Sequence, residues 1–368
     1  MTMTTQQLFE AMTSSQMPKY KRTYTLYYRY DAYNNKWLRV TLPVSIDFDI
    51  SRNNLSSTNN ATFTLYNLSQ QVRDLMYRDP LDVGRPFNPK ETGFIEISNK
   101  DKRITENIGN MKDEDVSKLR NYIEVWMGYE SIGIEYMVFA GAVLSAFSYK
   151  QGVDYLTEIS AYSINLRDPQ TYYSYVAKAG TTKGSAIRYI ATQLAGIHEI
   201  YIDPEIDNEV LEEDTVMMGT AEEIISKYMG YKPFVDNYNL AIFSDKSILK
   251  EKPLIIDQNS GLLASPRRTQ NGVSISMLFE PLLRVGLPVQ LNAEIEATYN
   301  DTLFAVTGFK HSGSISTVKD SRTITEAELI IGKAGYFRPA RIDIVSKEEP
   351  KNDVIDATQD TYAGTMMS

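Results

Sequence analysis

Cysteine is absent from the 368-residue sequence, which excludes disulfides, thiolate metal sites and cysteine nucleophiles together. Histidine is scarce: only His198 and His311 are present, and they share neither metal-ligand spacing nor a third ligand of matching type. A histidine metal centre or proton relay is therefore not expected. We expect both residues to be surface or interdomain histidines.

Long apolar runs are also lacking. The longest, Tyr136 to Phe147, has twelve residues and is interrupted by Gly141 and Ser145, whereas crossing a bilayer takes about 20. The N-terminus has neither the basic start nor the apolar core of a secretory signal. We expect synthesis in the cytoplasm and no membrane insertion by this chain.

Positive charge is in deficit, with 38 basic against 47 acidic residues and a net charge of −9. This balance argues against a protein that coats nucleic acid or an anionic membrane. It does not exclude a wall past which nucleic acid slides without sticking.

Aromatic residues are abundant, with 25 tyrosines and 13 phenylalanines, and they favour sheet. Two-residue alternation predicts strands at Thr23–Tyr30, Leu38–Phe48, Ala61–Tyr66, Asn121–Tyr129, Tyr136–Tyr149 and Val153–Ile164. The short gap at 150–152 predicts a hairpin, and apolar residues at helical spacing within 67–76 predict a short helix.

The alternation is lost between Arg78 and Arg120. Residues 99–120 hold eleven charges of both signs, which indicates either a solvated insertion or a partner-docking arm. In both cases we expect this charged insertion to lie outside a core, because buried charges lose their hydration.

The middle of the chain, from Asp168 to about Ser260, mixes helix and strand. A helix is predicted at about Ser185–Ala195, and a second begins at a capping box of Thr220 and Glu223 and ends at Gly230. A hairpin follows at 234–243. Strands return at Val273–Phe279, Val289–Ala297, Leu303–Ser312 and Thr323–Ile331. Beyond about Ala340 the polar composition predicts a flexible or partner-ordered tail.

Catalytic motifs are not found. The stretch Gly180 to Ser185 lacks the spacing of a phosphate loop and is better explained as a helix N-terminus. Adjacent acids at 212–214 do not face each other across a cleft, and no Gly-x-Ser-x-Gly nucleophile elbow occurs. We therefore predict no enzyme, no cofactor and no bound metal.

Three ordered groups of residues resemble the baseplate hub proteins of tailed phages and related contractile particles, including the late-control tail proteins. The first contains Asn67, Leu68 and Arg73; the second contains Gly128, Tyr129, Phe139 and Gly141; the third contains Pro266, Gly272, Pro281 and Gly286. We expect these residues to be mostly architectural, with the glycines and Pro281 shaping strand ends and turns.

The resemblance implies a predominantly β, α+β fold in which two tail-tube-like β-barrels flank a small α+β module. The corresponding divisions are an N-terminal extension (1–20), a first barrel (21–167) carrying the insertion (78–120), the α+β module (168–260), a second barrel (261–340) and a C-terminal tail (341–368).

The implied function is that of a structural hub in the virion tail. A homotrimer would join the six-fold tail tube or distal tail protein to a three-fold spike or tip. It would contact other baseplate proteins and leave a channel for the tape-measure protein or for DNA that it does not bind stably. A tail-associated wall lysin and a carbohydrate-binding virion protein are the alternatives, the latter because tyrosine rings stack on sugars.

Overall fold

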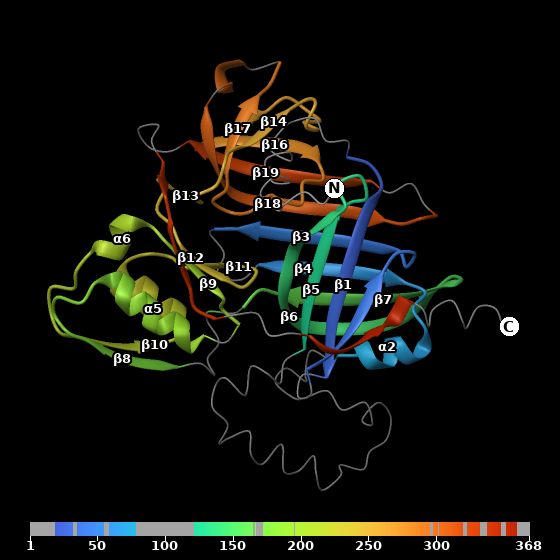
Figure 1. Ribbon diagram of the computed structural model, residues 1–368, viewed down its shortest axis with the longest axis horizontal. Coiled ribbons are helices and arrows are strands. Elements are labelled where there is room, and N and C mark those ends of the chain that lie inside the picture. The colour runs from blue at the N-terminus through green and yellow to red at the C-terminus, as the bar shows by residue number, and fades with distance from the viewer. Residues whose placement is uncertain are drawn as a thin grey trace, which may run out of the picture.

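The computed structural model describes residues 19–31, 35–54, 59–78, 121–164, 166, 172–194, 196–294, 297–300, 302–318, 322–331, 337–346 and 351–358. Strands predominate among these residues, and the helices are few and short (Figure 1). The predominantly β, α+β fold class predicted from the sequence is confirmed. The charged insertion lies outside the described residues, apart from Arg78.

The first strand block begins the fold. Its elements are β1 (Arg22–Asp31), β2 (Lys36–Thr41), β3 (Ile46–Asn53), β4 (Asn60–Tyr66), α2 (Gln70–Met76), β5 (Tyr122–Tyr129), β6 (Ile134–Gln151) and β7 (Asp154–Tyr162). The short helix and the β6–β7 hairpin are confirmed. The single strand predicted at Leu38–Phe48 is wrong: it divides into β2 and β3 at a turn closed by Val44 N–H on the Thr41 carbonyl. Pro43 in this turn has no N–H to donate to a sheet.

The long strand β6 joins two layers of the first block. Its first half pairs with β5 and its second half with β7, so β1 and β5 lie across the layer of β3, β4 and β7 (Figure 1). The apolar side of each alternating strand faces the space between the layers. Leu26, Phe63 and Phe139, each fully buried, are among the residues that fill it.

The middle region packs helices on short strands. It comprises β8 (Tyr173–Ala177), α5 (Lys183–Gln193), β9 (Glu199–Ile202), α6 (Pro204–Asn208), β10 (Thr215–Gly219), α7 (Ala221–Ile224), the π-helical turn η3 (Ile225–Met229), β11 (Phe234–Asp236) and β12 (Asn239–Ile242). The capping box of Thr220 and Glu223 is confirmed. The predicted helix N-terminus is also confirmed, since Thr182 caps α5.

The second strand block follows. It contains β13 (Ser247–Ile248), β14 (Leu254–Asp257), β15 (Arg267–Arg268), β16 (Gly272–Leu278), β17 (Pro288–Asn292), the 3-10 turn η4 (Ala297–Tyr299), β18 (Leu303–Ile315), β19 (Thr323–Ile331) and β20 (Arg338–Pro339). β17 ends earlier than predicted, because the Asn300 side chain bonds both backbone groups of Ala293 in place of a strand partner.

The two blocks repeat one pattern of antiparallel pairing. β4, β7, β6 and β5 are neighbours in that order, and β16, β19, β18 and β17 are neighbours in the same order. Each block also has a bulge in the same strand pair. The register shifts between Val143 and Ser145 where β6 meets β7, and between Val306 and Gly308 where β18 meets β19. The chain therefore contains one supersecondary unit twice.

Aligning the two bulges makes residues of the two blocks correspond, strand by strand. On the exposed side of each sheet, Thr62 corresponds to Ser274, Thr64 to Ser276, Glu158 to Glu326, Ser160 to Glu328, Phe147 to Lys310 and Tyr149 to Ser312. The pairing of β4 with β7 and of β16 with β19 keeps this correspondence without a register shift.

Strand β3 connects the two blocks into one sheet. It pairs with β4 on one edge and with β18 on the other, from Asn53 opposite Gly308 to Ile46 opposite Ile315. The path of hydrogen-bonded neighbours runs β15-β16-β19-β18-β3-β4-β7-β6-β5-β1-β2-β22. Sheet pairing thus continues from one repeat into the other without interruption.

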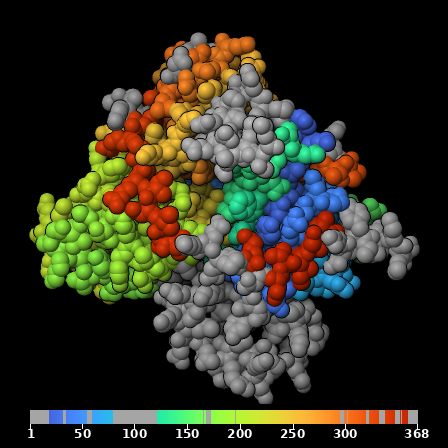
Figure 2. Space-filling model, in the orientation of Figure 1, coloured from blue at the N-terminus to red at the C-terminus, as the bar shows by residue number. Residues whose placement is uncertain are grey.

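The described residues beyond Ala340 form strands within the fold, where the sequence predicted a flexible or partner-ordered tail. β21 (Arg341–Ile344) pairs with β9, and β22 (Asn352–Asp356) pairs with β2. The final segments, coloured red, lie on the surface of the middle region and of the first block (Figure 2). Backbone hydrogen bonds to open strand edges hold them, and such bonds require no apolar side chains.

Candidate functional site

The continuous sheet exposes a polar face made by alternate residues of β16, β19, β18, β3, β4 and β7. One row across this face contains residues opposite one another in adjacent strands: Ser276, Glu326, Lys310, Ser51 and Asn60. The next row contains Ser312, Asp49, Thr62 and Ser160. We call this surface, which spans both repeats, the polar face.

Carboxylates outnumber cations on the polar face. Asp47, Asp49, Glu158, Glu326 and Glu328 carry negative charge, and Lys310 lies among them at the junction of β18 with β3. Its ammonium contacts the Asp49 carboxylate at 2.7 Å, with both side chains nearly half exposed. The hydrogen bond to Asp49 raises the pKa of Lys310. Ser51, Thr62, Ser160, Ser274, Ser276 and Ser312 add hydroxyls, so the charged part of the face is mainly acidic and is interspersed with hydroxyls.

A second side chain on this face is held by a carboxylate. The Tyr66 hydroxyl donates to Asp47 Oδ2 at 2.6 Å. This hydrogen bond, followed by burial, raises the pKa of Tyr66 to about 12.

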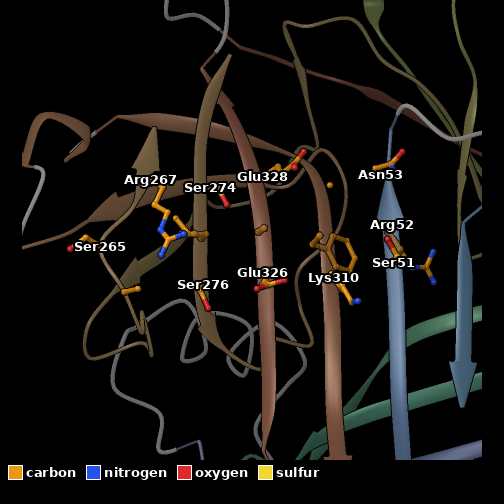
Figure 3. Close-up of a pocket in the computed structure, with 15 residues that line it drawn as sticks. Ser51, Arg52, Asn53, Ser265, Arg267, Ser274, Ser276, Lys310, Glu326 and Glu328 are labelled. Atoms are coloured by element: carbon orange, nitrogen blue, oxygen red, sulfur yellow. The ribbon is translucent and has the colours of Figure 1, made fainter. Parts of the chain in front are cut away.

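A groove of about 510 Å³ lies at one end of the polar face. Ser274 and Ser276 of β16, Glu326 and Glu328 of β19 and Lys310 of β18 stand on adjacent strands along it, with Arg267 of the edge strand β15 beside Ser274 (Figure 3). The groove mixes charges of both signs with hydroxyls. It therefore offers a polar contact surface.

On the opposite side of β3, a buried arginine joins the two repeats to the middle region. The Arg52 side chain is fully buried, and its guanidinium donates to Asp236 Oδ1 at 2.5 Å and to the Val138 carbonyl at 3.1 Å. It also bonds Asn237 and lies 5.1 Å from the centre of the Phe139 ring. Burial lowers the pKa of Arg52, opposed by the charge of Asp236.

The hairpin of β11 and β12 inserts its turn into this junction. Asn237, with a φ of 55°, accepts from the Ala140 N–H at 2.8 Å. Next to it, the Tyr238 hydroxyl donates to Glu124 at 2.9 Å, and Glu124 also contacts Lys351 at 2.6 Å. Burial, and then the Glu124 charge, raise the pKa of Tyr238. Strands β3, β5 and β6 therefore fix the position of the middle region.

Of the two histidines, both expected at surface or interdomain positions, one is found in the core. His198 is partly exposed and stacks on Tyr238 with ring centres 4.5 Å apart. His311 is fully buried instead of lying at a surface or interdomain position, and its Nδ1 is 2.8 Å from the Thr325 hydroxyl. Burial, followed by the charge of Arg52, lowers the pKa of His311 to about 3. His311 therefore stays neutral in the core at physiological pH.

The first group of sequence-predicted residues lies at the start of α2. Asn67 adopts a φ of 55° and ties the chain to the β7 strand, with its amide donating to Asp154 at 2.8 Å and accepting from Tyr155 N–H at 2.9 Å. Leu68 is buried, and the Arg73 guanidinium lies 4.0 Å from the Tyr155 ring centre. These three residues fix α2 against the β6–β7 hairpin.

The second group lies in the core between the layers. Tyr129 is buried and donates to the Phe279 carbonyl at 2.7 Å, while Phe139 packs edge-on against Phe63 and beneath Arg52. Gly128 and Gly141 lie within strands rather than at turns. A Cβ at Gly128 would meet the Ile134 carbonyl, and one at Gly141 would meet the Tyr162 carbonyl. Both glycines therefore permit close approach of neighbouring backbones.

The third group lies in the second block. Pro266 is buried just before β15, Gly272 begins β16 against the Leu329 carbonyl, and Pro281 lines a cavity of about 410 Å³ beside His198 and Tyr238. Gly286 has a φ of 84° and leaves room for the Phe243 ring. The structure does not gather the three groups into one site.

Sequence reasoning missed the residues of the polar face, and it missed buried Arg52 with its partners Asp236 and Asn237. A signal for the face was present in β3, since the run Ile46 to Ser51 alternates apolar and polar residues. Among the described residues, no group of three or more potential ligands could hold a metal ion, and no helix is long and apolar enough to cross a membrane.

Comparison with known proteins gives one family match. The model of the family described as baseplate hub gp41 matches residues 32–312. No curated protein sequence matches the chain.

Several solved structures are similar at low sequence identity. A tail protein from Neisseria meningitidis MC58 is 12% identical, with a TM-score of 0.46 over 78% of this chain and 96% of that one. The 43 kDa tail protein of prophage MuSo2 from Shewanella oneidensis is 11% identical, with a TM-score of 0.47 over 87% and 100%. The E. coli c3393 protein, a component of the type VI secretion system, is 9% identical, with a TM-score of 0.45 over 81% and 76%.

Proposed function

This chain belongs to the baseplate hub gp41 family, and we propose that it works without catalysis as a homotrimeric ring between a tail tube and a spike or tip. In this proposal the two repeats correspond to the two tail-tube-like barrels (21–167 and 261–340), and the middle region (168–260) is the module between them. The motif residues described above have architectural roles in holding these parts together.

The observation that carries the proposal is the sheet shared by the two repeats. Because β3 pairs with β18, each chain presents two copies of one strand unit side by side. Three chains would then present six such units (3 × 2). A ring of this kind offers six similar surfaces to a six-fold tube and three identical ones to a three-fold spike.

The polar face is the surface that we assign to the channel. Carboxylates repel phosphate, and hydroxyls carry no charge that would neutralise it, whereas each phosphate neutralised by lysine or arginine releases counterions and adds affinity that would slow transit. The net charge of −9 per chain gives −27 for a trimer (3 × −9) and acts in the same direction. DNA or a tape-measure protein could pass such a wall without binding it stably.

The proposed partners follow from this position in a virion tail baseplate. They are a second and third copy of the chain, a tail tube or distal tail protein above, a spike or tip protein below, a tape-measure protein within, and other baseplate proteins around the ring. We assign contacts with those surrounding proteins to the charged insertion (78–120), because its eleven charges within 99–120 would be costly to bury.

Cryo-electron microscopy of purified particles tests the proposal. We expect three copies of the chain in one ring, with Asp49, Glu326 and Lys310 facing the lumen. A hub with one or six copies, or a ring in which the polar face points outward, would contradict it.

A further inference from the structure

The second half of β6 has an edge that other described residues leave open beyond Ala146. β7 occupies the opposite edge as far as Gln151, and on the open side Ala146 forms a single bridge with Arg78. Leu144, Phe147 and Tyr149 are each 41% exposed beside this edge, and the rings of the last two are 6.0 Å apart. An exposed strand edge with apolar side chains is a template for pairing with another chain.

The other repeat shows what occupies the corresponding edge. β18 corresponds to β6, and beyond its bulge the edge opposite β19 is filled by β3. Lys310 and Ser312, which correspond to Phe147 and Tyr149, face Ser51 and Asp49 of β3. Among the described residues of its own chain, the first block therefore lacks a strand that the second block has.

Strand β15 is the counterpart of β3. β3 pairs with β4 and β15 pairs with the corresponding strand β16, so Arg267, opposite Ser274, takes the place that Asp49 holds opposite Thr62. β15 ends the path of hydrogen-bonded strands in the described sheet. Arg267 and Arg268 are both exposed there.

We infer that β15 of one copy pairs antiparallel with the second half of β6 of the next copy, repeating between chains the β3–β18 pairing. This inference rests on the proposed homotrimer and identifies its subunit contact. It sets Arg267 opposite Tyr149 and beside Phe147, so that a guanidinium meets aromatic rings. Glu158, directly opposite Phe147 in the sheet, supplies a carboxylate for the same cation.

The geometry of the contact suits a closed ring. The two surfaces lie at different places on the same chain, so the contact is head-to-tail, and such contacts form rings when the rotation closes. The in-chain and between-chain pairings would then alternate around the ring. Six strand units would be joined by six similar pairings.

Disulfide trapping tests this contact, because the natural chain has no cysteine. In particles carrying the double variant Tyr149→Cys with Arg267→Cys, mild oxidation should shift the chain on a non-reducing gel to a covalent species of three chains. Mixing the two single variants should give covalent dimers only. The matched control, Tyr149→Cys with Arg268→Cys, places the second cysteine on the other side of β15 and should remain uncrosslinked.

The possible results distinguish failure of the β6–β15 contact from failure of the proposed function. A ring of three copies without cross-linking of the 149–267 pair, or with equal cross-linking of the control, would overturn the β6–β15 contact and leave the hub proposal standing. A particle with another copy number would overturn both. If the double variant does not enter particles, the structure of particles with the natural sequence tests the contact instead. The Cα atoms of Tyr149 and Arg267 in adjacent copies should then be about 4.5–5.5 Å apart, and a clearly larger distance would refute the contact.

Discussion

Replacing Arg52 with methionine should destabilise the protein strongly. The arginine side chain is fully buried and that of Asp236 is only 10% exposed, so the substitution leaves a carboxylate in the core without its cation. Removing one partner of a buried ion pair costs about 3–5 kcal/mol, because the remaining charge has lost its hydration and its counterion. The Val138 carbonyl also loses its hydrogen bond from Arg52.

Urea unfolding followed by tryptophan fluorescence measures this loss. The two tryptophans, Trp37 and Trp126, lie in β2 and β5, so the transition reports the first strand block, to which Arg52 belongs. Lys310→Met is the matched control. It removes the cation of the Lys310–Asp49 ion pair, whose nitrogen–oxygen distance of 2.7 Å is similar to that of Arg52–Asp236. Both side chains of the control pair, however, are nearly half exposed. That change should cost below about 1 kcal/mol.

A double variant, Arg52→Met with Asp236→Leu, completes the test. Removing both charges should recover most of the stability lost in Arg52→Met, because no buried charge is then left unpaired. Equal losses for Arg52→Met and Lys310→Met would refute the reasoning, and so would a double variant less stable than Arg52→Met.

Three further predictions follow from single observations. Gly141→Ala should lower the free energy of unfolding by about 1–3 kcal/mol in the same urea assay, because its Cβ would collide with the Tyr162 carbonyl, and a wild-type midpoint would contradict this. His311 has a pKa of about 3 when folded and 6.5 when unfolded. Between about pH 3 and 6.5 the unfolded chain therefore binds a proton at His311 that the folded chain does not bind. The contribution of neutral His311 to the free energy of unfolding is full above about pH 6.5 and falls by about 1.4 kcal/mol per pH unit towards pH 3. His311→Leu should lack this part of the slope in unfolding measured from pH 7 to 5. The isolated protein should not retain duplex DNA in a mobility-shift assay at near-physiological salt, and retention at micromolar protein would contradict the channel assignment.

The elements that the sequence predicted well are those decided by neighbouring residues. Alternation located most strands, and Thr220 with Glu223 located the start of α7, because a capping box is a contact across three residues. The Leu38–Phe48 prediction failed where alternation continued through a turn at Pro43. Apolar spacing alone does not show where backbone hydrogen bonding stops.

What the sequence did not predict depends on partners far along the chain. The pairing of β3 with β18 joins residues more than 250 positions apart, and the local sequence of neither strand identifies its partner. The burial of His311 follows from that pairing, since Ile50 lies opposite it. The C-terminal strands β21 and β22 were missed for the same reason, since they pair with the edges of β9 and β2, which lie far back along the chain.

The two repeats differ both in their cores and on their exposed sides, and a few exposed positions keep their chemistry. At buried positions Phe63 corresponds to Ile275, and Ile159 and Ala161 correspond to Ala327 and Leu329, so volume lost at one site is regained beside it. A core accepts such exchanges while its total volume is kept. On the exposed side, threonine corresponds to serine at two positions of β4 and β16, and Glu158 corresponds to Glu326. Three other exposed positions differ: Ser160, Phe147 and Tyr149 correspond to Glu328, Lys310 and Ser312. Packing does not require a hydroxyl or a carboxylate at exposed positions. The recurrence of these two hydroxyls and one carboxylate in both repeats therefore needs a reason outside the core, and the channel that we propose along this face would supply one.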